Sequence, residues 1–305
     1  MAKVVITGGT GLIGKALSAE LANDYEVVIL SRNPKKYAKS MPANVQLVLW
    51  DAVSADGWAE HADGAHAIIN LAGAGIADAR WTPARKELII NSRVNAGKAV
   101  VQAIEQAQIK PQVLLQASAV GYYGNREAEV LDETSAPGTD FMADVVQQWE
   151  ASTTQVDEMG VRRAVMRIGV VLSNDGGALP KLVMPFGLFA GGGLGSGEQY
   201  MSWIHEYDLI RSIRMLMEDG AANGVYNLTA PAPVENITMA RKIGTVLGKP
   251  SLLSAPAIAL KLLMGEMSAV VLDGQRVIPI RLKQQGYRFR YADVETALRN
   301  LLVAG

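Results

Sequence analysis

A glycine-rich stretch near the N-terminus, VVITGGTGLIG at residues 4–14, constrains the fold more than any other part of the sequence. Its apolar start predicts a buried strand, and the apolar residues that follow the glycines recur at helical spacing. Gly8, Gly11 and Gly14 permit a tight turn, close approach of a pyrophosphate to the backbone, and close packing of the helix on the strand. A turn in another kind of α/β protein would also use glycine, but the position between strand and helix favours a dinucleotide site. The residues expected to bind the dinucleotide are Gly8, Thr10, Gly11, Leu12 and Ile13.

Composition excludes several other classes of protein. The formal net charge is −1 and no run of Lys or Arg interrupts the sequence, which argues against nucleic acid or an anionic membrane as the main partner. The chain has no cysteine, so disulfides and thiolate metal sites are excluded, and no His, Asp or Glu cluster has the spacing of a metal site. The longest apolar stretches, near 179–194 and 252–265, are interrupted by Lys or Pro, so no membrane helix is expected. Without a signal-peptide pattern, the sequence favours a cytoplasmic protein.

Alternating strand and helix signals fill the first half of the chain. Strands are expected at 26–30, 46–49, 66–71 and 113–117, with a return to the sheet at 163–171, and the longest helices at 87–106 and 140–158. This alternation predicts an α/β fold with a doubly wound parallel sheet at 1–175. Glycines crowd the chain from Gly176, and no clean alternation follows. Residues 176–305 are therefore expected to form a smaller, mixed or helical substrate lobe, from which a segment near 203–230 returns to the first domain.

The end of the second predicted strand indicates which dinucleotide the chain prefers. An acidic residue there selects NAD, whereas arginine accommodates the 2′-phosphate of NADP. This chain has Ser31 and Arg32 and no carboxylate, so NADP(H) is expected, although Arg32 would look the same as a solvated loop residue. Asp51 is placed to meet the adenine amino group or to cap a helix. The small residues after the fourth strand, Leu71, Ala72 and Gly73, are expected to let the cofactor pass.

Longer motifs resemble a known family. The segments TGGTGLIG, NLAG at 70–73, ASAVGYYG at 117–124 and WIHEYD at 203–208 resemble those of extended short-chain dehydrogenases/reductases. RWTPARKELIINSRV, RIGVVLSNDGGALPK and GSGEQYMSWIH are similar to the YfcH-type epimerase-like branch of that superfamily, the NAD-dependent epimerase/dehydratases. The resemblance runs nearly end to end. It implies a Rossmann domain that binds NADP(H) and a small C-terminal substrate lobe.

The acid/base residues that the resemblance implies are missing. Typical members carry a Tyr-x-x-x-Lys pair, whose tyrosine exchanges a proton with the substrate hydroxyl. Those two places fall here on Met142 and Val146, or on Phe141 and Val145 in the neighbouring register. The catalytic Ser/Thr place falls on Ala119, one residue after Ser118. Ser118, which either faces the nicotinamide or bonds to backbone, and Tyr122, which either reaches the cleft or packs in the core, are the remaining catalytic candidates.

The glycine loop at 191–197 leads into a polar and aromatic segment. Gln199 and Trp203 are the expected substrate contacts on the wall of the second lobe, and the alternative is a connector whose aromatic residues pack that lobe. The expected partner is a small molecule, nucleotide-linked compounds included. Two functions remain open: an NADP(H)-dependent epimerase-like enzyme or oxidoreductase with unusual acid/base groups, and a non-catalytic NADP(H)-sensing regulatory or scaffold protein.

Overall fold

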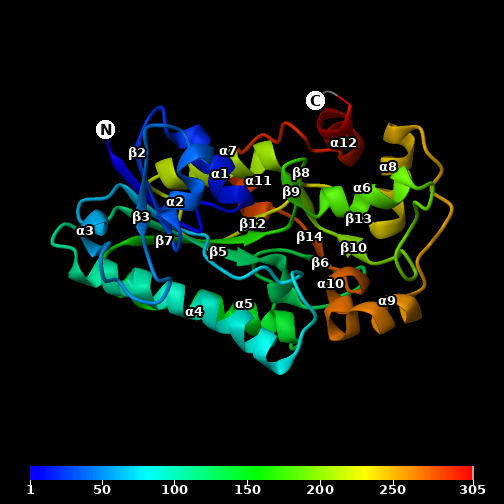
Figure 1. The fold of residues 1–305 in the computed structure, drawn as a ribbon, viewed down its shortest axis with the longest axis horizontal. Coiled ribbons are helices and arrows are strands. Elements are labelled where there is room, and N and C mark those ends of the chain that lie inside the picture. The colour runs from blue at the N-terminus through cyan, green and yellow to red at the C-terminus, as the bar shows by residue number, and fades with distance from the viewer. Residues whose placement is uncertain (304–305) are drawn as a thin grey trace.

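A parallel seven-stranded sheet forms the centre of the computed structural model, which describes residues 1–303 (Figure 1). Its strand order is β12-β7-β5-β4-β1-β2-β3, and every neighbouring pair is parallel. The strands are β1 (Lys3–Thr7), β2 (Glu26–Ser31), β3 (Val45–Leu49), β4 (Ala67–Asn70), β5 (Val113–Ala119), β7 (Arg162–Ile168) and β12 (Gly224–Leu228). Because the chain runs outward from β1 in both directions, the β1–β4 boundary is the switch point where such sheets bind ligands. The α/β, doubly wound fold class is confirmed.

Helices cover both faces of this sheet. Helices α1 (Leu12–Leu21) and α7 (Glu206–Glu218) lie together on one face, and α3 (Ala59–Ala62), α4 (Pro83–Gln106) and α5 (Phe141–Ala151) lie on the other (Figure 1). The middle of strand β1 is apolar at successive positions, because both faces of the strand are buried. Val4 and Ile6 join the core beneath α1 and α7, whereas Val5 joins the core beneath α3 and α4. A strand buried on both faces favours apolar side chains at successive positions.

A smaller lobe lies at the end of the molecule where the C-terminal helices gather (Figure 1). Its core joins residues of α6 (Leu179–Gly187), α8 (Asn236–Leu247) and α12 (Val294–Leu302). Short strands flank it: β8 (Val170–Ser173), β9 (Gly176–Gly177), β11 (Trp203–His205), β10 (Tyr200–Met201) and β13 (Val234–Glu235). Three further helices lie between α8 and α12 in the chain: α9 (Ala257–Met264), α10 (Ala269–Leu272) and α11 (Ile280–Gln284). Strand β14 (Arg276–Val277) pairs with β6 (Val130–Leu131). The remaining helices are α2 (Pro34–Tyr37) and the 3₁₀ helices η1 (Ala38–Ser40), η2 (Val120–Tyr123), η3 (Thr154–Met159) and η4 (Gly265–Ser268).

Three predicted elements have different bounds in the structure. The helix expected at 140–158 ends at Ala151, because the hydroxyls of Ser152, Thr153 and Thr154 bond to the last carbonyls of α5. The helix expected from residue 87 already starts at Pro83, with Thr82 as its N-cap.

The strand expected at 163–171 is two strands in different sheets. They separate at Gly169, where a Cβ would lie 2.4 Å from the carbonyl oxygen of Ser202. Strand β12 then pairs with β7, so the main sheet takes its last strand from the second half of the chain. Within residues 1–303, no helix has both the length and the apolar character needed to cross a bilayer.

Candidate cofactor and substrate site

The turn between β1 and α1 is built on glycine for reasons that the geometry makes explicit. Gly8 has a φ of +66°, and a Cβ there would lie 2.7 Å from the carbonyl oxygen of Leu71. A Cβ on Gly14 would lie 2.4 Å from the Cα of Gly9, so α1 packs directly on the turn. Gly11 is exposed, and as the N-cap of α1 it provides no side-chain cap. The first turn of α1 therefore presents backbone N–H groups to a ligand at its open end.

Buried polar residues fix the neighbouring strand ends. The hydroxyl of Thr7 donates to Oδ1 of Asn70 over 2.6 Å and accepts the N–H groups of Leu71 and Ala72, each over 3.2 Å. The amide of Asn70 in turn donates to Oε1 of Gln116 over 2.8 Å. This chain of hydrogen bonds ties β1, β4 and β5 together at their carboxyl ends. The segment at 71–73 is thereby held beside the glycine turn.

Arg93, which the sequence did not indicate as a site residue, holds the same segment in place. Arg93 of α4 is buried and donates from Nη1 to the carbonyl oxygens of Ala74 and Ile89, over 3.0 and 2.9 Å. Burial, together with the charge of Arg85, lowers the pKa of Arg93 to about 10. A Cβ on Gly73 would lie 3.1 Å from the Arg93 side chain, so a larger residue there would have to displace that side chain slightly. The neighbouring Ser92 holds this segment too, because its hydroxyl accepts the N–H of Ala74 over 3.0 Å.

Positive charge gathers beyond the end of β2. Ser31 is buried and its hydroxyl accepts the N–H of Asn33, whereas Arg32 is exposed at the end of the strand. Lys35 and Lys36 follow in α2. Within residues 1–303, none of these three cations pairs with a carboxylate. A phosphate dianion at this edge would meet uncompensated positive charge.

Asp51 caps a turn. Its Oδ1 accepts the N–H groups of Val53 and Ser54, over 2.8 and 2.9 Å, and its Oδ2 accepts the Ser54 hydroxyl. The backbone hydrogen bonds from Ser54 and Val53 hold the pKa of Asp51 below its usual value. In the structure this carboxylate caps a turn rather than a helix, and its contact with adenine stays a prediction.

Ser118 faces a buried ion pair. Its hydroxyl donates to Oε1 of Glu150 over 2.5 Å, and Glu150 holds the guanidinium of Arg167 through two bonds of 2.8 and 3.0 Å. The side chains of Arg167 and Glu150 are 4% and 14% exposed, so water screens this pair little. Burial alone would lower the pKa of Arg167, but Glu150 raises it above its usual value. The Ser118 hydroxyl thus bonds to this pair rather than to backbone, and its role in catalysis stays a prediction.

Tyr122 and Tyr123 belong to the same network. The Arg167 guanidinium carbon lies 3.3 Å from the centre of the Tyr122 ring, which covers it. The Tyr123 hydroxyl donates to Oδ1 of Asn227 over 2.7 Å, and burial raises the pKa of Tyr123 to about 12. Tyr123 is buried, and Tyr122 is half-buried against the small apolar cluster that contains Tyr123. Neither lines the cavity described next, and the catalytic role of Tyr122 stays a prediction that this geometry does not favour.

A cavity of about 510 Å³ lies between the carboxyl ends of the sheet and the C-terminal lobe. Ala119 and Met142 line it, which are the places where the resemblance implies the catalytic Ser/Thr and Tyr. Trp81, Phe141 and Ile168 add apolar surface. The acids Asp140, Glu266 and Asp273 supply its only charged side chains among the described residues. The lining therefore combines an apolar body with negative charge. No group of His, Cys, Asp and Glu in residues 1–303 is arranged to hold a metal ion.

Comparison with known proteins identifies the family. The model of the NAD dependent epimerase/dehydratase family matches residues 4–229. The chain belongs to this family. A domain of unknown function, DUF1731, matches residues 255–301, which include Asp273. The resemblance drawn from the motifs is thereby confirmed.

Individual relatives extend over almost the whole chain. The epimerase family protein SDR39U1 homolog of Arabidopsis thaliana chloroplasts is 41% identical over 302 residues, which cover 98% of this chain and 86% of the relative. An epimerase family protein of Staphylococcus haemolyticus is 37% identical over the full length of both. A crystal structure of human epimerase family protein SDR39U1 with NADPH has a TM-score of 0.87 at 31% identity and covers 98% of each chain. A UDP-galactose 4-epimerase, with a TM-score of 0.74 at 18% identity, shares the fold.

Trp203 packs in the interior of this epimerase-family chain. Its side chain is fully buried in the core of the C-terminal lobe, and its indole N–H donates to the carbonyl oxygen of Ala232 over 3.0 Å. Gln199 is also committed to the protein itself. Its amide donates to the carbonyl oxygens of Leu194 and Val271, over 2.9 and 2.8 Å. Both side chains therefore have structural roles here, because the loop turns these polar atoms toward neighbouring backbone, and this favours the connector alternative.

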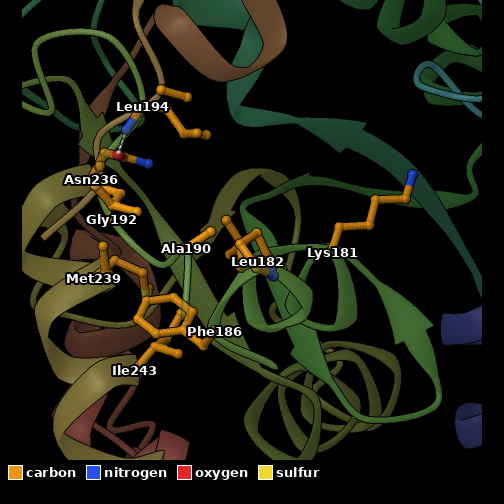
Figure 2. A pocket seen from close by; sticks show the side chains of 14 residues that line it. Lys181, Leu182, Phe186, Ala190, Gly192, Leu194, Asn236, Met239 and Ile243 are labelled. Atoms are coloured by element: carbon orange, nitrogen blue, oxygen red, sulfur yellow. Dashed lines mark hydrogen bonds between the residues drawn. The ribbon is translucent and has the colours of Figure 1, made fainter. Parts of the chain in front are cut away.

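A smaller apolar cavity, about 110 Å³, lies where this glycine loop passes between α6 and α8 (Figure 2). Phe186, Met239 and Ile243 form its apolar wall, and Lys181 reaches away from it (Figure 2). The carboxamide of Asn236 accepts the N–H of Leu194 over 2.8 Å, so the polar groups at its edge bond to each other. This cavity therefore results from the way the loop packs, and we assign no catalytic role to it.

Replacing Gln199 by alanine is expected to lower the free energy of unfolding by about 1–3 kcal/mol, because two carbonyl oxygens lose their donor. Denaturant unfolding measures this change, with Glu198→Ala, an exposed neighbour, as the matched control. An unchanged midpoint for Gln199→Ala would show that its amide does not hold the loop.

Proposed function

We propose that this chain is an NADP(H)-binding, epimerase-like oxidoreductase whose substrate occupies the 510 Å³ cavity. The observation that carries the cofactor choice is the set of exposed, unpaired cations led by Arg32, beside an open helix N-terminus that no side chain caps. The NADPH in the human relative supports the same choice. We place its activity in the cytoplasm, which suits a chain without cysteine.

The residues present fit NADP(H) in two places. The N–H groups of Leu12 and Ile13 in the first turn of α1 would hold the pyrophosphate, with Gly8 and Gly11 leaving room for it. Ser31 and Arg32 would hold the 2′-phosphate. When bound, the nicotinamide supplies or accepts a hydride. Thr7 and Arg93 act indirectly, since they fix the segment at 71–74 that the cofactor passes.

The protein's contribution to proton transfer differs from that of typical relatives. Ala119 and Met142 cannot donate or accept a proton, and Val146 is buried and uncharged. The cavity groups able to exchange a proton are the carboxyls of Asp140, Glu266 and Asp273. We therefore propose a reaction whose acid/base group is one of these carboxyls, or a reaction in which a group of the substrate itself serves as the acid or base.

A non-catalytic NADP(H) sensor is the second candidate. The observation favouring it is that the places of the usual serine and tyrosine are filled by Ala119 and Met142 at the cavity wall. In that case the cavity would bind an effector without changing it.

Replacing Arg32 by alanine is expected to weaken NADPH binding by about ten- to a hundredfold, equivalent to the 1.5–3 kcal/mol of a charge-assisted hydrogen bond. NADH, which lacks the 2′-phosphate, should bind both proteins equally. Calorimetric titration of both cofactors measures the difference, with Lys39→Ala in the nearby 3₁₀ helix η1 as the control. Equal loss of NADH and NADPH affinity, or no loss, would contradict the assigned role of Arg32.

A further inference from the structure

The charges that line the large cavity limit the kinds of ligand it can bind. Its lining in the described chain contains three carboxylates and neither lysine nor arginine. A pyrophosphate or other anionic group is normally held by cations or by backbone N–H groups. Here such a group would meet negative charge instead. The cavity therefore disfavours the nucleotide-linked compounds that the sequence left open as substrates.

The three acids are not equally available. Glu266 pairs with Lys86, which leaves its charge compensated. Asp140 is the N-cap of α5, where it accepts the N–H of Ala143 over 2.9 Å and that of Asn125 over 3.2 Å. The carboxyl of Asp273, in contrast, has no hydrogen-bond partner within residues 1–303 although it is half-buried. Burial, followed by the charge of Asp140, raises the pKa of Asp273, and Lys261 opposes this shift.

Apolar and aromatic side chains make up most of the rest of the wall. Trp81 and Phe141 meet edge to face with their ring centres 5.0 Å apart, and the Trp81 indole N–H is occupied by the carbonyl oxygen of Ile76. Met142 and Ile168 extend this surface toward the sheet. Such a wall favours a flat, apolar molecule and gains further from a cation near the aromatic faces.

We propose that the cavity binds a small molecule with an aromatic or alicyclic body and one basic nitrogen, whose positive charge lies against Asp273 and Asp140. The inference rests on the proposed function, since it names the substrate class of the same site. A cavity of about 510 Å³ has the size of a site for one such molecule. The cation supplies the partner that the Asp273 carboxyl lacks, and the apolar body covers Trp81, Phe141 and Met142.

A matched set of probes tests this inference: 1-naphthylmethylammonium, 1-naphthylmethanol and 1-naphthoate, which carry positive, no and negative charge on the same ring system, and UDP. Calorimetric titration, with and without NADPH, is expected to rank the ammonium at least tenfold tighter than the carboxylate, with UDP not binding in the cavity. Asp273→Asn should abolish the preference for the ammonium over the alcohol. Asp144→Asn, an exposed change on α5, should keep it.

The melting temperature provides a second readout. Because burial raises the pKa of Asp273, its ionised form costs folding free energy at neutral pH, so Asp273→Asn should melt at the same temperature as the wild type or higher. Equal affinity for the three naphthalenes, tighter binding of UDP, or an unchanged preference in Asp273→Asn would overturn the inference. Failure of NADPH to bind would overturn the proposed function alone, since the probes are also measured without NADPH.

Discussion

Replacing Glu150 by alanine is expected to lower the free energy of unfolding by about 3–5 kcal/mol, which makes it the most damaging single truncation considered. The reason is that Arg167 is almost fully buried and both of its bonds to Glu150 would be lost, together with the one from Ser118. A buried guanidinium without its carboxylate keeps its desolvation penalty and loses its compensation. Denaturant unfolding followed by circular dichroism measures the change.

The matched control is Glu129→Ala. Glu129 also receives two hydrogen bonds from an arginine, Arg126, each 2.8 Å long, but this pair lies at the exposed surface. Its truncation should change stability little, since water screens exposed pairs. The double variant Glu150→Ala/Arg167→Met should be less destabilised than Glu150→Ala, because no unpaired charge remains buried. A Glu150→Ala protein as stable as Glu129→Ala would show that the ion pair contributes nothing.

The elements of the first domain could be predicted from the sequence because neighbouring residues alone indicate each strand and helix. The strand from Val4 and the helix after Gly11 follow from apolar periodicity and glycine alone, and the structure has both elements at those positions. Boundaries were less predictable where a distant segment decides them. Gly169 separates β7 from β8 because the backbone of Ser202 approaches it, and nothing near Gly169 in the sequence indicates that contact.

Site residues, too, could be predicted where the order of elements places them, but not where a distant segment decides their contacts. Arg32 is visible from the sequence because its place after the second strand follows from the order of elements. Gln199 and Trp203 were predicted as substrate contacts from residue type, but their partners, Val271 and Ala232, come from separate segments of the lobe. Asp273 was missed for a related reason. It reaches the cavity only because the C-terminal chain folds back beside α5, and a lone aspartate carries no pattern of its own.

Replacing Gly11 by aspartate is expected to weaken NADPH binding by at least about a hundredfold, close to 3 kcal/mol, without unfolding the protein. Gly11 is the N-cap of α1 with φ −79° and ψ 179°, a conformation that aspartate adopts readily. The new carboxylate would accept the N–H groups of the first turn and repel the pyrophosphate that we propose binds there. Gly11→Ala serves as the control, because it adds the same Cβ, 3.3 Å from the carbonyl oxygen of Gly8, without the charge.

Calorimetric titration of NADPH into the wild type, Gly11→Ala and Gly11→Asp tests whether the open N-terminus of α1 is the phosphate site of an NADP(H)-binding protein. We expect tight binding by the wild type, weaker binding by Gly11→Ala, whose Cβ takes up room beside the pyrophosphate, and loss of binding by a Gly11→Asp protein that melts at the wild-type temperature or above. Wild-type affinity for NADPH in a folded Gly11→Asp protein would contradict this assignment.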